Sequence, residues 1–382
     1  MILTDAVLNA YINANIMLIF AFALWKFIQY TNNKLKFQLP YIFQLRLLNG
    51  VFLAIALSPI AIAAIAASIQ LGLLSPDFSM SVSDIAVAQY LNGSIEMKAV
   101  EFERVLGIRN TFMQDILSLN TPTGFFIAVL FSIGFTAIFA RSIINIFKLR
   151  SVLRASYAWR QFGNLKIRLS DTTFIPFSTR SLNTRYVVIP SGMLAENEDL
   201  KMALGHELQH IRQGDVEWAF ILEALRPFFF WNPVFYFWKR QVQQLRELAC
   251  DQQLVLNKHF DIQAYCECLL KVCKNSIRKE DSYSIALPAV PFVQVENTPL
   301  GLSAAASLKH RIIAMVEPAT TPISRKAFAC LLLPAMALVI LMSLAIQKPG
   351  DWSQDRLMLS TIVNLERMES RATAVQPSQE PF

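Results

Sequence analysis

The residues best suited to chemistry in this chain are two histidines that stand four positions apart. The segment His206-Glu207-Leu208-Gln209-His210 holds two of only four histidines. Positions four apart on an α-helix project from one face, so both imidazoles can bind one Zn²⁺ at about 2.0–2.1 Å per Zn–N bond. Glu207 can reach a water molecule beside the ion and act as a general base. The pattern predicts a zinc hydrolase site; the alternative is a chance match on an exposed helix.

Two histidines leave a catalytic zinc one protein ligand short, and a later segment carries suitable acids. Residues 239–256 are predicted to form a helix, on which Glu247 and Asp251 lie four apart on one face. We expect Glu247 to be the third metal ligand. We expect Asp251 to accept the second N–H of a ligating imidazole, which fixes the tautomer of that ring. The alternative for this pair is a solvated acidic face.

The histidines need a helix with one face toward a core and the other toward the site. Asn197 can cap a helix that starts near Glu198, and Gly214 stands where a glycine would end it. The apolar stripe on the side away from the histidines consists of Leu200, Leu204, Leu208 and Ile211.

A short β-branched run that ends in proline precedes this helix at residues 186–190, and it predicts a strand. We expect a peptide substrate to bind to it as an added strand. The substrate-binding residues would then be Tyr186, Val187, Val188 and Ile189.

The composition is that of a membrane protein. Of 382 residues, 54% are hydrophobic and only 16% are charged. Four apolar runs are each long enough to cross a hydrocarbon core of about 30 Å. They cover residues 8–28, 48–74, 124–147 and 327–347. No basic segment precedes the first run, which indicates a retained anchor and not a cleaved signal peptide.

The distribution of lysine and arginine between the loops predicts the orientation. Basic residues follow the first and third runs and precede the fourth, whereas the loop 75–120 is rich in acids. We expect a bacterial-type inner membrane protein with both termini and the loop 75–120 outside. Residues 1–148 would be a membrane region, 149–326 a cytoplasmic domain and 348–382 a short, flexible outer tail. The excess of basic residues on the inner side and their contact with lipid headgroups then explain the net charge of +7. We expect no direct nucleic-acid binding.

Residues 218–238 are apolar and aromatic but are interrupted by charged residues and prolines. A fifth span here would carry Glu247 across the membrane from the histidines. We therefore expect a re-entrant or interfacial helical hairpin, with a buried core hairpin as the alternative. Residues 276–305, rich in Ser, Pro and Ala, are predicted to be a loose connector.

Three cysteines with the spacing C-x-C-x₄-C stand near His259, and a second metal site there is one interpretation. They are Cys266, Cys268 and Cys273. The spacing matches no standard zinc pattern, so buried thiols on a helix are the simpler interpretation.

Three segments resemble the membrane metallopeptidases of the BlaR/MecR type, which form the M56 family of antirepressors and signal transducers. They are His206–Asp215, Trp231-Asn232-Pro233 and Arg246–Asp251. Residues 186–190 and 308–312 are similar to that family's strand and distal helix. The resemblance implies a mainly α membrane protein with four transmembrane helices and a cytoplasmic α+β zincin domain. It also implies cleavage of the chain itself or of a cytoplasmic transcriptional repressor.

The resemblance further implies a gluzincin centre. His206, His210 and Glu247 would be zinc ligands and Glu207 the catalytic base. Asp251 and Asp215 would support the ligands, although an ordinary acid at a helix end is the alternative for Asp215. His259 and Tyr265 come into question as the oxyanion partner, with a structural role as the alternative for each.

The chain departs from the β-lactam sensors of this family, which carry a penicillin-binding domain with a Ser-x-x-Lys nucleophile after the last span. Only about 35 residues follow here, and the Ser-x-x-Lys match at 276–279 falls on the cytoplasmic side. We therefore expect no covalent β-lactam sensing; the loop 75–120, the tail or a partner would sense a signal. The remaining alternatives are an HtpX-like quality-control protease and a non-catalytic receptor or scaffold with structural zinc. Association with a second copy stays open.

Overall fold

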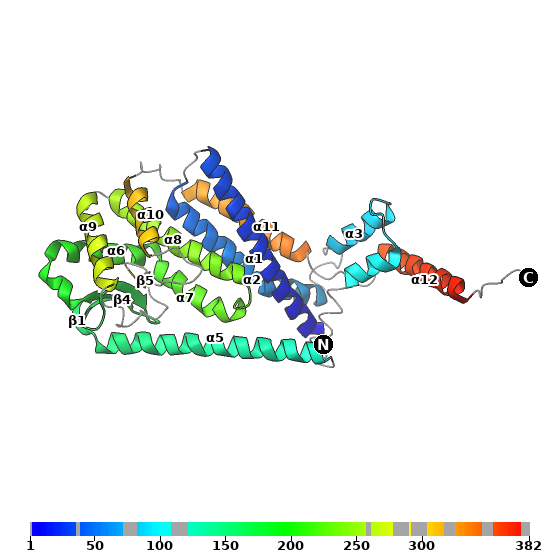
Figure 1. Ribbon diagram of the computed structural model, residues 1–382, viewed down its shortest axis with the longest axis horizontal. Coiled ribbons are helices and arrows are strands. Elements are labelled where there is room, and N and C mark those ends of the chain that lie inside the picture. Colours follow the sequence, from blue (N-terminus) through cyan, green and yellow to red (C-terminus); the bar gives the residue numbers. More distant parts are fainter. Residues whose placement is uncertain are drawn as a thin grey trace, which may run out of the picture. The chain divides into compact units, whose positions relative to one another are not determined.

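The computed structural model describes residues 2–35, 39–71, 82–107, 121–256, 261–277, 290–291, 304–316, 325–345 and 354–375. Over these residues the chain is mostly helical, with one small sheet (Figure 1). It divides into two compact units. The first contains Met1–Ala21, Leu53–Ser132 and Leu333–Phe382, and the second contains Phe22–Phe52 and Ile133–Leu332.

Three described helices are long and apolar enough to cross a membrane, and they coincide with three of the four predicted runs. The apolar stretches are Asn9–Leu35 of α1 (Ile2–Leu35), Tyr41–Ala64 of α2 (Tyr41–Gln70) and the whole of α5 (Pro122–Ala155). The fourth run falls in α11 (Arg325–Ala345), a helix of 21 residues that is not among the three candidate spans of the described residues. The fourth span therefore stays a prediction.

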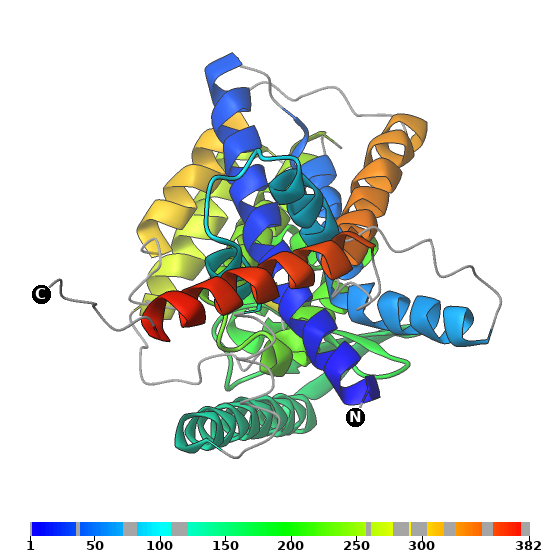
Figure 2. The same ribbon diagram turned by 90° about the vertical axis from the view of Figure 1, so that its right-hand side faces the viewer.

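In the first unit, α3 (Val82–Leu91) and the helical residues 99–107 pack against α12 (Gln354–Val375), which is red in Figure 2. The buried side chains of this contact are Val87, Ala99, Phe102, Leu359 and Val363. The prediction of a flexible tail after Lys348 was therefore wrong for residues 354–375. Leu359 and Val363 lie four apart on one helix face, and burying them favours the helix despite the polar average of the tail.

The second unit contains a five-stranded sheet of β1 (Tyr157–Phe162), β2 (Leu165–Ser170), β3 (Phe177–Arg180), β4 (Arg185–Pro190) and β5 (Val290–Pro291). The order across the sheet is β1-β2-β4-β3-β5. β2 and β4 are parallel, and the other neighbours are antiparallel.

The strand predicted at residues 186–190 is β4, but its position in the sheet corrects the expected mode of substrate binding. β4 pairs with β2 along one edge and with β3 along the other, so it has no free edge for an added strand. Val187, Val188 and Ile189 are also completely buried. Tyr186 pairs with Lys166 and Thr179 of the neighbouring strands, so it too lies in the interior of the sheet.

Five helices complete the second unit: α6 (Asn197–Gln213), α7 (Asp215–Leu225), α8 (Pro233–Leu256), α9 (Ile262–Ile277) and α10 (Ala304–Val316). The helix α6 lies between two apolar clusters. Leu200 and Ile211 pack toward Val187 and Ile189 of the sheet. Met202 and Ala203 pack into a cluster with side chains of α8, α9 and α10. Each fully buried leucine or isoleucine contributes about 1.5–3 kcal/mol to such packing.

The predicted ends of α6 are nearly correct. Gly214 ends the helix with φ +79°, in the left-handed region that favours glycine. The helix begins at Asn197, one residue earlier than expected, and no side chain caps this end.

The hairpin predicted at residues 218–238 is the junction of α7 and α8 through a 3₁₀ turn at Arg226–Phe228. The helix α8 starts at Pro233, six residues before the predicted start at Lys239. Asn232 explains this start, because its Oδ1 accepts a hydrogen bond from the N–H of Val234 at 3.1 Å, and proline suits the first turn. How the hairpin relates to the bilayer stays a prediction.

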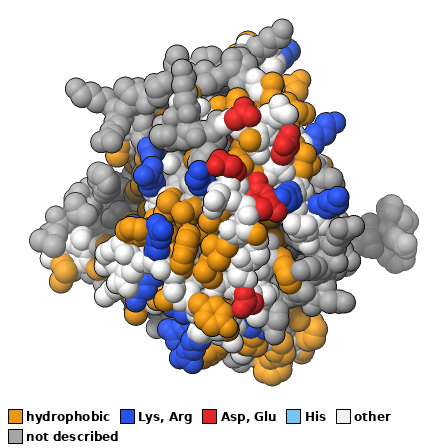
Figure 3. Space-filling view, turned by 90° about the vertical axis from the view of Figure 1, so that its left-hand side faces the viewer, with side chains coloured by type: hydrophobic (Ala, Val, Ile, Leu, Met, Phe, Trp, Pro, Cys, Tyr) orange, Lys and Arg blue, Asp and Glu red, His pale blue; other side chains and the backbone are white. Residues whose placement is uncertain are grey.

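Most of the predicted connector 276–305 lies outside the described residues, as does His259. The described part corrects the prediction of a loose segment, because Val290 and Pro291 pair with Ser178 and Phe177 and add β5 to the sheet. Figure 3 shows the face that lies on the left in Figure 1, where charged and hydrophobic side chains are interspersed.

Candidate metal centre

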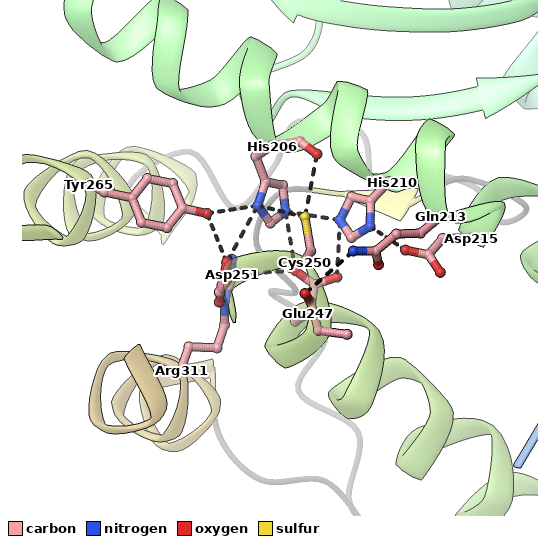
Figure 4. A network of polar contacts seen from close by, with 10 residues as sticks. His206, His210, Gln213, Asp215, Glu247, Cys250, Asp251, Tyr265 and Arg311 are labelled. Carbon is pink, nitrogen blue, oxygen red and sulfur yellow. Dashed lines mark hydrogen bonds and ion pairs between the residues drawn. The ribbon is translucent and has the colours of Figure 1, made fainter. Parts of the chain in front are cut away.

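The two histidines of the HExxH pattern lie on α6, completely buried and facing α8 (Figure 4). Their Nε2 atoms are 2.9 Å apart, and their rings are perpendicular with centroids 4.5 Å apart. The two Nε2 atoms are therefore close enough to bind one ion, as the four-residue spacing predicts.

Glu247 of α8 is the third candidate ligand beside the two histidines. Its Oε2 lies 3.5 Å from Nε2 of His206, and its Oε1 lies 3.7 Å from Nε2 of His210. Ligands at about 2.0–2.1 Å from a tetrahedral zinc lie about 3.3–3.4 Å from one another. The two nitrogens are 2.9 Å apart, and each has one Glu247 oxygen at 3.5 or 3.7 Å. These separations are close to the spacing of zinc ligands, so the three side chains fit a zinc-sized ion.

Glu207 is completely buried, and neither of its carboxylate oxygens has a hydrogen-bonding partner of normal geometry among the described residues. Burial raises the pKa of Glu207 to about 7, although His210, His206 and the nearby Ser178 hydroxyl act in the opposite direction. A buried carboxylate without partners is costly, which points to a ligand or water at this place. A pKa near neutrality suits a group that must both take and return a proton.

Asp215 lies beside His210 and orients it. As the first residue of α7, it follows the left-handed turn at Gly214. Its Oδ2 accepts a hydrogen bond from Nδ1 of His210 at 2.8 Å. With the proton on Nδ1, the lone pair of Nε2 is free for a metal.

Asp251 does not contact His206 in the way that the sequence predicted. Its Oδ1 is 3.5 Å from Nδ1 of His206, too far for a good hydrogen bond. The hydroxyl of Tyr265, on α9, is 2.7 Å from that Nδ1 and 2.8 Å from Asp251 Oδ1. Tyr265, considered above for the oxyanion, therefore lies on the Nδ1 side of His206, away from Nε2.

Two further residues of the centre were missed by the sequence analysis. Cys250, completely buried, has its Sγ 3.4 Å from Nδ1 of His206. Among the described residues, His206, His210 and Cys250 are the group whose ligand atoms all lie within 4.8 Å of one another. The three-residue step from Glu247 to Cys250 is the signal that could have indicated this.

The second missed residue is Arg311 of α10, which is 4% exposed. Its Nε and one Nη donate to Asp251 at 2.7 and 2.8 Å, and the other Nη lies 3.1 Å from Glu247 Oε2. Burial alone would raise the pKa of Asp251, but the Arg311 guanidinium overrides it and holds that pKa well below its usual range. Arg311 is 60 positions from Asp251, so no local spacing could have revealed the pair.

The cysteines Cys266, Cys268 and Cys273 lie on α9 without forming a second cluster of ligands in the described part of the chain. Cys268 and Cys273 are buried, and Cys268 Sγ donates to the carbonyl of Asp199 at 3.8 Å. Burial raises the pKa of the Cys268 thiol to about 12, with Asp199 adding to the effect, so this thiol stays protonated at neutral pH.

Comparison with known proteins identifies the family of this chain. No curated protein is significantly similar in sequence. The family model described as BlaR1 peptidase M56 matches residues 6–294 of the 382, which include the three apolar helices, the sheet and the helices α6 to α9. This family consists of metallopeptidases embedded in membranes. The chain therefore belongs to the BlaR1 peptidase M56 family, and its buried histidine pair lies within the part that carries the match.

Proposed function

We propose that this membrane metallopeptidase is a zinc endopeptidase in which His206, His210 and Glu247 bind Zn²⁺ and Glu207 is the general base. The observation that carries the proposal is the approach of three candidate ligands to one another. The two Nε2 atoms are 2.9 Å apart, Oε2 of Glu247 lies 3.5 Å from Nε2 of His206, and Oε1 of Glu247 lies 3.7 Å from Nε2 of His210. The neighbouring Glu207 carboxylate is buried and has no hydrogen-bonding partner of normal geometry in the part of the chain that the structure describes, which supports a place for water beside these side chains.

The reaction would be hydrolysis of a peptide bond. A bound Zn²⁺ would polarise the scissile carbonyl and lower the pKa of the attacking water toward about 7. Glu207 takes the proton from this water and returns it to the leaving amine. Asp215 holds the proton of His210 on Nδ1, which keeps Nε2 directed at the ion.

We prefer Glu247 to Cys250 as the third ligand. The carboxylate oxygens of Glu247 approach both Nε2 atoms, whereas Sγ of Cys250 is in contact with Nδ1 and the carbonyl of His206. Metal analysis of Glu247→Gln and Cys250→Ser tests which residue is the third ligand. We expect Glu247→Gln to lose the metal and Cys250→Ser to retain it.

The substrate would bind in extended form along the outer edge of β3, not along β4. Ser178 of β3 lies near Glu207, and the outer edge of β3 is where Val290 and Pro291 of the chain itself pair as β5. This pairing supports cleavage of the chain's own connector. A cytoplasmic repressor would be a second substrate. An outer signal would thereby reach transcription, as in the BlaR/MecR type.

The zincin domain would lie in the cytoplasm, with four spans and both termini outside. The basic residues after the first and third apolar runs support this orientation. Reporter fusions in the loop 75–120 and after residue 150 would test it: an outer loop and an inner domain are expected, and the reverse result would contradict it.

The decisive experiment compares wild type with Glu207→Gln. The variant should retain its metal but cleave its substrates at least about 100-fold more slowly, because the general base is lost. Glu198→Gln, which changes an exposed acid in the first turn of the same helix, is the matched control.

Fragment analysis in cells that carry each protein would identify substrates. Cleavage of one regulator is expected; broad cleavage of damaged membrane proteins would favour an HtpX-like role, and unchanged cleavage by Glu207→Gln would refute the site.

A further inference from the structure

The two histidines of the centre are held by different partners. His210 donates directly to Asp215 at 2.8 Å. At Nδ1 of His206, Asp251 Oδ1 is 3.5 Å away and Cys250 Sγ is 3.4 Å away, whereas the Tyr265 hydroxyl is closer, at 2.7 Å. The orientation of His206 therefore depends on a neutral side chain from α9, a helix that supplies no proposed ligand.

The direction of these hydrogen bonds follows from the charge of Asp251. Two N–H groups of Arg311 donate to its oxygens, so Asp251 is ionised and can only accept. Tyr265 must give its single proton to Asp251 and accept one at its own oxygen from Nδ1 of His206. This places the proton of His206 on Nδ1 and its lone pair on Nε2, the atom that faces Glu247.

Arg311 joins the two acids of α8. Its planar guanidinium binds Asp251 through Nε and one Nη and reaches Oε2 of Glu247 with the other Nη at 3.1 Å. All three residues are less than 5% exposed, so water does not screen these contacts. Glu247 is thereby held with both oxygens directed at the histidines.

We infer that Tyr265 and Arg311 are positioning residues of the metal centre: Tyr265 fixes the tautomer and orientation of His206, and Arg311 fixes Asp251 and Glu247. The inference rests on the proposed function, because it takes His206 and Glu247 as ligands. It adds the helices α9 and α10 to a centre that the sequence pattern places on α6 and α8 alone.

The test uses the purified full-length chain in detergent and measures Zn²⁺ and Co²⁺ affinity by competition with a chelator. Tyr265→Phe keeps the ring and removes the hydroxyl, and we expect its affinity to fall 10–100-fold, roughly as when other partners of metal ligands are lost. The visible spectrum of bound Co²⁺ should shift as His206 turns. Tyr236→Phe is the matched control, because its exposed hydroxyl donates to the Phe230 carbonyl instead; its affinity should match wild type.

Arg311→Lys keeps the charge but cannot reach both acids at once, so it should also weaken metal binding, by a similar factor. A purely structural role would lower the unfolding temperature of metal-free and metal-loaded protein equally and leave the affinity unchanged, and that result would overturn the inference. Wild type that binds no metal would refute the proposed function and this inference with it. Wild type and Tyr265→Phe that bind equally would refute this inference alone.

Discussion

Asp215 and His210 belong to two different helices, yet Asp215 Oδ2 lies 2.8 Å from Nδ1 of His210. Only Gly214 separates α6 from α7, and its left-handed backbone turns the first residue of α7 back toward the last turn of α6. A short sequence thus contains both a proposed ligand and the acid that orients it.

Replacing Asp215 by Asn tests this contact. The amide keeps the size but loses the charge that holds the proton on Nδ1, so metal affinity should fall about 10–100-fold. Asp171→Asn is the control: this exposed acid, which follows β2, accepts a hydrogen bond from the Ser191 hydroxyl. Chelator competition on both variants gives the answer. Equal affinities would show that Asp215 is an ordinary acid at a helix end.

Gly214→Ala should destabilise the protein by about 1 kcal/mol, because φ of +79° is unfavourable for a residue with a Cβ. Steric crowding adds little, since the nearest atom to the new Cβ is Glu217 Oε2 at 3.9 Å. The strain should also displace Asp215 and weaken metal binding. Gly163→Ala, at φ +54° between β1 and β2, carries a similar backbone cost and should leave metal binding intact. Thermal unfolding and metal titration of both variants distinguish the two effects.

The metal-free protein should lose stability in acid through Asp251. Burial opposes ionisation, but Arg311 prevails and the folded-state pKa lies below the ordinary value of 3.8. A lowered pKa means that the folded state binds its proton less readily than the unfolded chain. The stabilisation is therefore full above about pH 4 and is lost as the pH falls below it. Unfolding temperatures between pH 7 and pH 3 should fall more steeply for wild type than for Asp251→Asn; parallel curves would contradict this.

Gly134→Leu tests whether the α7–α8 hairpin packs on α5. A Cβ at Gly134 would come within 2.4 Å of the Phe230 ring, so the ring must move. We expect a loss of about 1–3 kcal/mol, typical of an overpacked contact. Ala137→Leu enlarges an exposed position on the same helix and should have little effect. Unfolding temperatures in detergent provide the comparison, and equal values would place the hairpin elsewhere.

Local patterns predicted the parts of the molecule that depend on neighbours in sequence. The spacing of His206 and His210, the glycine that ends α6 and three apolar helices were all visible as periodicity and composition. Residues 186–190 were correctly predicted as a strand. The interior position of this strand in the sheet was not predicted, because strand order depends on pairing between distant segments.

Long-range contacts account for what the sequence could not predict. Tyr265 and Arg311 reach the centre from helices that begin after Asp251. The sequence analysis considered Tyr265 only for the oxyanion and Arg311 only as part of a segment that resembles the family, because their contacts with His206 and Asp251 are not encoded in any local spacing. The helix α12 was overlooked because its buried residues are few and are separated by polar ones. The pairing of Val290 with Ser178 depends on a backbone contact that no side-chain pattern encodes.

Arg311 follows the connector in sequence, so a cut between α9 and α10 would separate it from the proposed ligands. Such a cut would split the centre between two polypeptides, the histidines and Glu247 on one and the guanidinium on the other. The docking of α10 through Leu308 and Met315, together with the packing of α12 on α3, would then keep the fragments together. A nicked molecule would hold its metal for as long as that fragment complementation lasts.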